Sequence, residues 1–259
     1  QYVARNGNNI TLQFQTTHPV NIREMKIAGK KAEFSSENND RMHWTVSYTV
    51  SDGDTADNDK IKLYFVTGDD AGNADVESNE NRDIIYYAPI VISDVTFSSD
   101  NAKNGNAYAK DGDTITVNFT SNHDVQTSGV LVSGKPADIS SYNDGIKEIH
   151  TITYRLNNGD CIDQSDVTFN FRADDIAGND PVINTDYNAQ GVIRYYAPLT
   201  QKTVISGSGK NKKFIRNGDT VTVSVNTNHE AFFTSSQIFS RTASTNGNNT
   251  SGLSANIVI

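Results

Sequence analysis

The sequence predicts an all-β protein built of tandem antiparallel β-sandwiches, on three observations. A short segment recurs three times at a nearly constant spacing. Between these landmarks, apolar and polar residues alternate with a period of two, which is typical of strands that bury one face. Turn signals separate the alternating runs, and no stretch carries the 3.6-residue apolar stripe of an amphipathic helix.

The recurring segment is a Gly turn followed by an alternating run, and each copy leads to a His. Its three copies are Arg5–Phe14, Lys110–Phe119 and Arg216–Val225. The turn glycines Gly7, Gly112 and Gly218 give a spacing of 105 and then 106 residues. Other landmarks recur in the same order, so the chain is expected to repeat one domain of this length.

Each full repeat is expected to hold seven short strands. In the middle copy, Ile115, Val117 and Phe119 share one face, while the intervening Thr and Asn residues share the other. The strands expected in this copy are 90–97, 113–120, 125–132, 136–139, 148–155, 166–172 and 191–196. Seven short alternating strands in a domain of about 100 residues are the pattern of an immunoglobulin-like sandwich.

Tyr-Tyr-Ala-Pro closes one repeat and opens the next, at 86–89 and 195–198. Its Pro lacks a backbone donor and suits a strand end or a short linker. We therefore expect a first repeat at 1–88 that lacks its opening strand, a complete repeat at 89–198, and a partial, divergent repeat at 199–259. Gln1 stands where an initiator Met would, so we expect a mature or excised piece whose targeting signal is not visible.

Composition excludes several functions. The net charge of −9, with 20% charged residues, opposes binding to nucleic acid, which requires clustered Lys and Arg. No apolar run approaches the roughly 18 residues that span a bilayer, so no transmembrane segment is expected. The lone Cys161 cannot form an internal disulfide, so the fold depends on packed cores.

Three segments of the chain resemble the bacterial immunoglobulin-like repeats of surface adhesins and cell-wall proteins. They are Asp-Gly-Asp-Thr-Ile-Thr-Val-Asn-Phe at 111–119, Gly-Lys-Pro-Ala at 134–137 and Asp-Ile-Ala-Gly-Asn at 175–179. The resemblance covers the first two repeats, and the third through about His229. It implies an extracellular or cell-surface location and a stalk that holds a binding domain away from the cell. Some such repeats bind glycans or proteins themselves.

Two acidic turns are candidate calcium sites, because Ca²⁺ binds six to eight carboxylate, amide and carbonyl oxygens. Their residues are Asp69, Asp70, Asn73, Asp174, Asp175 and Asn179. The alternative is a pair of solvated hairpin turns, in which Gly and Asn serve positive φ angles. Apart from calcium, no cofactor is expected. Asp57 belongs to a third acidic loop, at 52–59, for which calcium is a weaker hypothesis.

His18, His123 and His229 end equivalent strands, one in each repeat. A metal needs several converging ligands, so we interpret each as a strand-end residue that hydrogen-bonds a loop. In the pairs Tyr86-Tyr87 and Tyr195-Tyr196, one ring should face out of its sheet. That ring is expected to pack against the next domain, and a glycan platform is the alternative.

Sequons at Asn9, Asn118 and Asn248 would be glycosylation sites only in a eukaryotic secreted protein. No carboxylate pair in an apolar cleft, no nucleophile elbow, no Cys/His pair and no phosphate loop is seen. The chain is therefore not expected to be an enzyme and has no expected catalytic residue.

These observations predict a non-enzymatic extracellular structural or adhesive stalk. Two alternatives stay open. One is a subunit of an extracellular filament that assembles by strand exchange, because an open sheet edge accepts a strand from another chain. The other is a glycan- or protein-binding module. The expected partners are neighbouring immunoglobulin-like domains, copies of the chain itself, or a protein or glycan ligand.

Overall fold

The computed structural model of the protein describes residues 2–73, 75–145, 147–184, 191–210, 214–238, 240–247 and 250–258. Strands form most of this part of the chain, and its helices are two short 3-10 turns, η1 (Glu37–Asn39) and η2 (Lys103–Asn106). No helix among these residues has the length and apolar character to cross a bilayer. The predicted all-β class is therefore confirmed.

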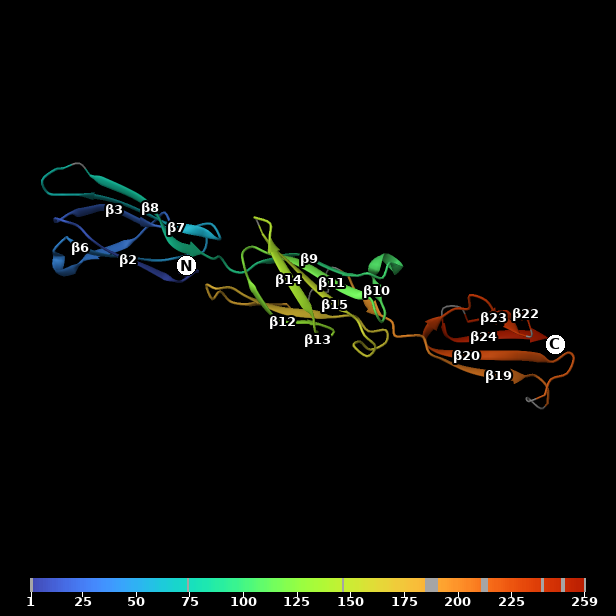
Figure 1. Cartoon of the computed structure of the whole chain (residues 1–259). Helices are drawn as coiled ribbons and strands as arrows, with labels where there is room; N and C mark the ends of the chain where they lie inside the picture. Colours follow the sequence, from blue (N-terminus) through green and yellow to red (C-terminus); the bar gives the residue numbers. More distant parts are fainter. Residues whose placement is uncertain are drawn as a thin grey trace. The chain divides into compact units, whose positions relative to one another are not determined.

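The first repeat forms two sheets (Figure 1). One has the order β1-β8-β7-β3-β4 and the other the order β2-β6-β5. Their bounds are β1 (Tyr2–Ala4), β2 (Asn9–Gln15), β3 (Asn21–Ile27), β4 (Lys30–Lys31), β5 (Glu33–Ser36), β6 (His43–Thr49), β7 (Asp59–Gly68) and β8 (Val76–Tyr86). All pairs are antiparallel except β1 with β8, where Ala4 lies opposite Tyr86.

Alternation in the sequence puts one face of each sheet into a shared core. Met25, Ile27, Leu63 and Tyr86 come from the larger sheet and Val46 comes from the smaller one. Each is at most 2% exposed. Because one apolar cluster joins inward faces of two sheets, the unit is a β-sandwich.

The middle repeat also has two main sheets, and each of them has four strands. Their orders are β14-β15-β11-β9 and β13-β12-β16-β17. A further short pair, β10 with β18, is parallel. The bounds are β9 (Ile92–Ser99), β10 (Tyr108–Ala109), β11 (Thr114–Ser121), β12 (Gln126–Val132), β13 (Lys135–Pro136), β14 (Asp138–Asn143), β15 (Glu148–Arg155), β16 (Phe169–Asp174), β17 (Val182–Asn184) and β18 (Arg194–Tyr195).

The predicted inward face of β11 is confirmed, since Ile115, Val117 and Phe119 are fully buried. Phe119 stacks on Phe171 of the opposing sheet with ring centroids 4.2 Å apart. An aromatic pair in this geometry adds roughly 0.5–1.5 kcal/mol to the burial of its surface. The two sheets are thus fixed to each other at the centre of the sandwich.

The strand pairing shows tandem immunoglobulin-like sandwiches. In the first two repeats, a short strand runs parallel to the last strand. In the middle repeat, β12 pairs antiparallel with β13 and β16, as do β14 with β15 and β16 with β17. The seven strands predicted for the middle copy are present with shifted ends. The short strands β10, β13 and β17 were not predicted, because pairs of two or three residues leave no readable alternation.

The third repeat forms one sheet with the order β19-β20-β24-β23 and a small hairpin, β21 with β22. The bounds are β19 (Gln201–Gly207), β20 (Thr220–Ala231), β21 (Gln237–Ile238), β22 (Arg241–Thr242), β23 (Ser244–Asn246) and β24 (Thr250–Val258). Antiparallel pairing of β19 with β20 places the opening strand of this repeat on the edge of the sheet.

Contacts divide the chain into two compact units. One comprises 1–98, 115–154 and 168–191, and thus the first repeat and nearly all of both four-stranded sheets of the middle repeat. The other comprises 99–114, 155–167 and 192–259. The predicted domain limits at 88 and 198 stay predictions.

Candidate functional site at the repeat junctions

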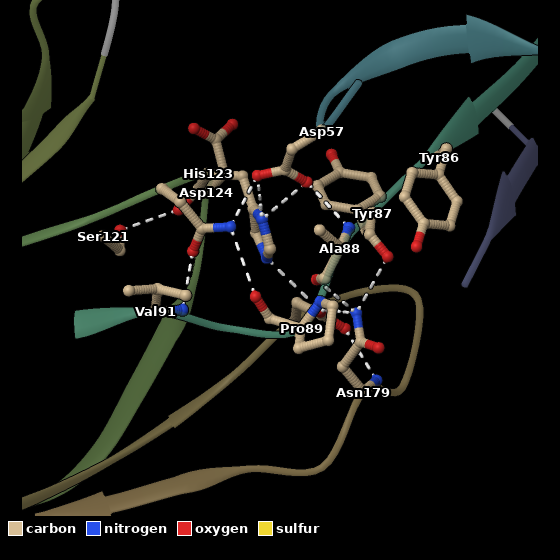
Figure 2. A network of polar contacts seen from close by, with 12 residues as sticks. Asp57, Tyr86, Tyr87, Ala88, Pro89, Val91, Ser121, His123, Asp124 and Asn179 are labelled. Atoms are coloured by element: carbon tan, nitrogen blue, oxygen red, sulfur yellow. Dashed lines mark hydrogen bonds and ion pairs between the residues drawn. The ribbon is translucent and has the colours of Figure 1, made fainter. Parts of the chain in front are cut away.

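A buried polar network joins the first repeat to the middle repeat (Figure 2). Four segments meet there: the β6–β7 loop with Asp57, the linker Tyr87–Pro89, Asn122–His123 after β11, and the β16–β17 turn with Asp175 and Asn179. All of them lie in the same compact unit.

His123 is the centre of this network. Its side chain is fully buried, and both ring nitrogens face carboxylates. Nδ1 lies 2.9 Å from Asp57 in the first repeat, and Nε2 lies 3.2 Å from Asp175 in its own repeat. An ionised carboxylate only accepts hydrogen bonds, so these contacts are all satisfied when both ring nitrogens carry hydrogen. Two carboxylates from different repeats thus hold the ring from opposite sides.

Asp57 accepts hydrogen bonds from three directions. Besides His123, the Ala88 amide donates to its Oδ1 at 2.8 Å and the Asn122 side chain donates to its Oδ2 at 2.6 Å. Burial raises the pKa of Asp57, but the bonds from His123, Ala88 and Asn122 outweigh burial and hold that pKa below its usual range. Asp57 is therefore fixed as an anion against the middle repeat.

The linker backbone is held by asparagine side chains of the middle repeat. Asn179 Nδ2 donates to the carbonyl oxygens of Tyr87, at 3.2 Å, and Ala88, at 2.9 Å. Asn122 Nδ2 also lies 3.3 Å from the Pro89 carbonyl oxygen, and Asn122 Oδ1 accepts from the Val91 amide at 2.7 Å. Polar groups of a short linker would otherwise need water, so these bonds restrict how the linker can bend.

An aromatic contact completes the junction. The Tyr87 ring meets the His123 ring edge-on, with centroids 4.7 Å apart. Tyr86 and Tyr87 are both buried, at 0% and 4% exposed. Tyr87 follows β8, and its ring faces the middle repeat. The prediction that a tyrosine of the pair packs on the next domain is confirmed.

The Asp, Asn, Ala and Tyr contacts around His123 occur a second time, in the other unit, around His229. His229 Nδ1 lies 3.2 Å from Asp163, and Asn228 Nδ2 donates to Asp163 at 3.0 Å. The Ala197 amide donates to Asp163 at 2.9 Å, and the Tyr196 ring meets His229 edge-on at 5.2 Å. Burial raises the pKa of Asp163, and the bonds from Ala197 and His229 outweigh it and lower that pKa.

The spacing between the partners is also repeated. Asp57 and His123 are 66 residues apart, as are Asp163 and His229. Sequence reasoning found the histidines but not their carboxylate partners. Asp57 and Asp163, and likewise Asn122 and Asn228, stand 106 residues apart, which was the available signal. The prediction that each strand-end His bonds a loop is confirmed for His123 and His229.

A hydroxyl links His123 to the core. Ser121 Oγ donates its one hydrogen to the His123 carbonyl oxygen at 2.7 Å. His150 Nε2, which lies 3.2 Å from the same hydroxyl, must therefore donate to Ser121 Oγ. His150 is 1% exposed, stacks on Phe119, and leaves its Nδ1 without a hydrogen-bond partner. Burial lowers the pKa of His150, against the opposing effect of Glu148.

The candidate calcium residues of the first repeat lie in the turn after β7. Asn73 donates its amide to Asp69 Oδ1 at 3.0 Å, and its side chain also donates to Asp69. Arg41 and Asn21 donate to Asp70. These bonds lower the pKa of Asp69 and that of Asp70.

The corresponding turn of the middle repeat differs in one pairing. Asn179 donates its amide and its side chain to Asp175, whereas Asp174 pairs with Arg172. The matched bonds align Asp69 with Asp175. Gly72 and Gly178 have φ angles of +80° and +74°, as the hairpin interpretation predicts. Its expectation of a positive φ was wrong for Asn73 and Asn179, which hydrogen-bond Asp69 and Asp175 instead.

Within the described residues, no group of three or more His, Cys, Asp or Glu side chains is arranged to hold a metal ion. The oxygens of Asp69, Asp70 and Asp175 accept hydrogen bonds from side chains or amides. Calcium at either turn stays a prediction, and an ion there would have to replace these donors.

The sequons differ in accessibility. Asn9 is exposed and contacts Thr11 and Thr49. Asn118 is half-buried on the outward face of β11, where its side chain accepts from Thr151 and donates to Thr96. Asn248 lies outside the described residues. Glycosylation of these positions stays a prediction.

Comparisons with known proteins do not place the chain in a family. No protein-family model matches it, and no curated protein matches it. Among solved structures, it is similar to the full ectodomain (Ig1–Ig3) of mouse nectin-like molecule 4. The two are 12% identical, with 98% of this chain and 85% of that chain covered, at a TM-score of 0.41. At this TM-score the likeness carries no weight, and the immunoglobulin-like fold is shown by the strand pairing itself.

Proposed function

We propose that the chain is a non-enzymatic, extracellular structural or adhesive stalk whose immunoglobulin-like repeats are locked to one another by their junctions. The observation that carries the proposal is the buried His123, held between Asp57 of the preceding repeat and Asp175 of its own. A buried polar group is stable only when its hydrogen bonds are made, so separating the repeats would leave Asp57 and His123 without each other as partners.

Repetition of the junction supports a structural role. A single buried ion pair between domains could serve only local stability. Here Asp, Asn, His, Ala and Tyr return in the same roles at 163, 228, 229, 197 and 196. A device that recurs with the repeat suits a function that depends on the orientation of successive repeats, as a spacer requires.

The linker supports it further. Flexible linkers are rich in Gly and Ser and leave their backbone groups to water. In contrast, Tyr87 and Ala88 between the first two repeats have both carbonyl oxygens and both amides hydrogen-bonded to protein groups. A linker bound in this way transmits orientation from one repeat to the next.

Distance measurement between spin labels tests the proposal. Labels are placed at Glu33 on β5 and Ser141 on β14, both exposed, in a chain with Cys161 replaced by Ser. We expect a narrow distance distribution in this chain and a broad one after Asp57→Ala. Asp59→Ala is the matched control, since Asp59 lies two residues away at the start of β7 and its carboxylate accepts from the neighbouring Lys60 amide. A distribution that is already broad before Asp57→Ala would contradict a locked stalk.

A further inference from the structure

In the middle repeat, His123, Asp175 and Asn179 together hold the preceding repeat and its linker, and we call this set the clamp. The first repeat carries a matching set in His18, Asp69 and Asn73. The Asn73 amide donates to Asp69 at 3.0 Å, as the Asn179 amide donates to Asp175 at 3.1 Å. A hydroxyl, Thr16 Oγ1, donates to the His18 carbonyl oxygen at 2.8 Å, as Ser121 does to His123. The groups that grip a preceding repeat are therefore already in place.

This copy of the clamp is open. The His18 side chain is 62% exposed, whereas that of His123 is fully buried. His18 Nε2 faces Asp69 at 3.7 Å. Among the described residues, the hydrogen-bond partner of its Nδ1 is the neighbouring Thr17 hydroxyl, whereas Nδ1 of His123 meets Asp57. A groove of about 650 Å³ lies beside these residues and is also lined by Phe14 and Val20.

A second opening follows the edge of β2. Ile10, Leu12 and Phe14 are half-buried, but Ile115, Val117 and Phe119 at the same positions of β11 are fully buried. In the middle repeat β9 pairs with this edge of β11, and in the third repeat β19 pairs with the matching edge of β20. Among the described residues, no strand pairs with β2 on that side.

One continuous segment closes both openings in the middle repeat. Tyr87 and Ala88 occupy the clamp of Asp175 and Asn179, and the chain then runs directly into β9. The matching occupant of the first repeat is therefore a carboxylate, two linker carbonyls and a following strand with alternating apolar residues.

The chain itself has no spare set of these groups among the described residues. Asp57 is bound to His123, and Asp163 is bound to His229. A second copy could offer either carboxylate only by opening one of its own junctions. This favours a further repeat as the occupant over a second copy of the chain.

We propose that the first repeat is the acceptor for the end of a further repeat of the same kind, held through His18, Asp69, Asn73 and the free edge of β2. The proposal rests on the proposed function, because it assigns the same junction to another place. Thr17 stands where the middle repeat has Asn122, so this junction lacks the side-chain amide that bonds the Pro89 carbonyl oxygen and the Val91 amide.

An extended chain tests this directly. Residues 1–106 are placed ahead of Tyr2, so that the added copy supplies Asp57, the linker and the β9 segment in the natural register. The added copy carries His18→Gln, which leaves one His18 to follow. Modification by diethyl pyrocarbonate, located by mass spectrometry, then reports the accessibility of His18 and of His123.

We expect the reaction rate of His18 to be at least roughly tenfold lower in the extended chain than in the present one, because His18 becomes reactive there only when the junction opens. Asp57→Ala in the added copy should restore much of its reactivity. Unchanged reactivity of His18 with His123 still protected would overturn the acceptor proposal and leave the proposed function intact. Reactive His123 would instead show that the junction itself fails.

Sedimentation of the present chain covers the alternative occupant. A monomer at all concentrations, with reactive His18, agrees with the proposal. A concentration-dependent dimer that protects His18 would show that a second copy fills the acceptor, and would overturn the assignment to a further repeat.

Discussion

Asp57 and His123 lie 66 residues apart in the chain and in successive repeats, yet their side chains meet at 2.9 Å in a buried junction. Asp57 also accepts a hydrogen bond from the amide of Ala88, in the linker between the two repeats. This pair therefore connects three parts of the chain, and it is the place where one substitution should have the largest effect on repeat orientation.

Asp57→Ala should open the first junction. A hydrogen bond to a charged group contributes about 1.5–3 kcal/mol, so the equilibrium for opening should rise roughly ten- to hundredfold. The rate at which diethyl pyrocarbonate modifies His123, read by mass spectrometry, measures this opening.

The second junction provides an internal control for that experiment. Asp163→Ala should raise the reactivity of His229 and leave His123 protected, because Asp163 contacts His229 and not His123. If both variants exposed both histidines equally, the substitutions would be unfolding the repeats rather than opening one junction each.

Acid should loosen both junctions. The pKa of Asp57 and that of Asp163 are lowered in the folded chain, so the unfolded carboxyls, with a pKa near 3.9, bind protons first as the pH falls. Their stabilisation is thus complete above about pH 4 and is lost below it. Exchange of the Ala88 and Ala197 amides, corrected for the intrinsic pH effect, should accelerate in that range.

Asp57→Asn isolates the carboxylate in this test. It should remove the acid-dependent acceleration at Ala88 while that at Ala197 persists, since Ala197 donates to Asp163. Equal behaviour of the two amides in the variant would mean that acid acts elsewhere in the repeats.

His150 should make the middle repeat sensitive to mild acid. Burial lowers the pKa of His150, so the folded chain binds this proton less readily than the unfolded chain does. The contribution of His150 to the free energy of unfolding is therefore complete above about pH 6.5 and declines below it. His150→Phe keeps an aromatic ring against Phe119 and should flatten the dependence of stability on pH below about 6.5, as measured by amide exchange in β11 and β15.

Calcium bound at the turn after β16 would change the hydrogen bonds of Asp175. A Ca²⁺ ion at Asp175 would take oxygens that now accept from Asn179 and His123. If it binds, EDTA lowers the melting temperature and Asp175→Asn abolishes the difference. A melting temperature that EDTA leaves unchanged would remove structural calcium at this turn.

Sequence reasoning reached the sandwich because local alternation reports burial. Ile115, Val117 and Phe119 were expected on one face, and all three are fully buried. It did not reach β10 or β13, whose two residues owe their strand conformation to a partner elsewhere in the fold.

The junction was only half visible for a similar reason. Each strand-end His repeated in an obvious motif, but Asp57 stood in an acidic loop that suggested a solvated turn or a cation site. Only the spatial meeting of that loop with Asn122 and His123 distinguishes one aspartate from its neighbours. Pairing across 66 residues is not encoded in any local pattern.

Residual dipolar couplings test the locked junction most directly. Backbone amides of the first repeat and of the middle repeat's β11, β12, β15 and β16 are measured in one weakly aligned sample of the full chain. A fixed junction predicts that one alignment tensor fits both sets, and that Asp57→Ala separates them into two tensors of different magnitude. Two tensors in the unmodified chain would contradict a stalk held rigid at this junction.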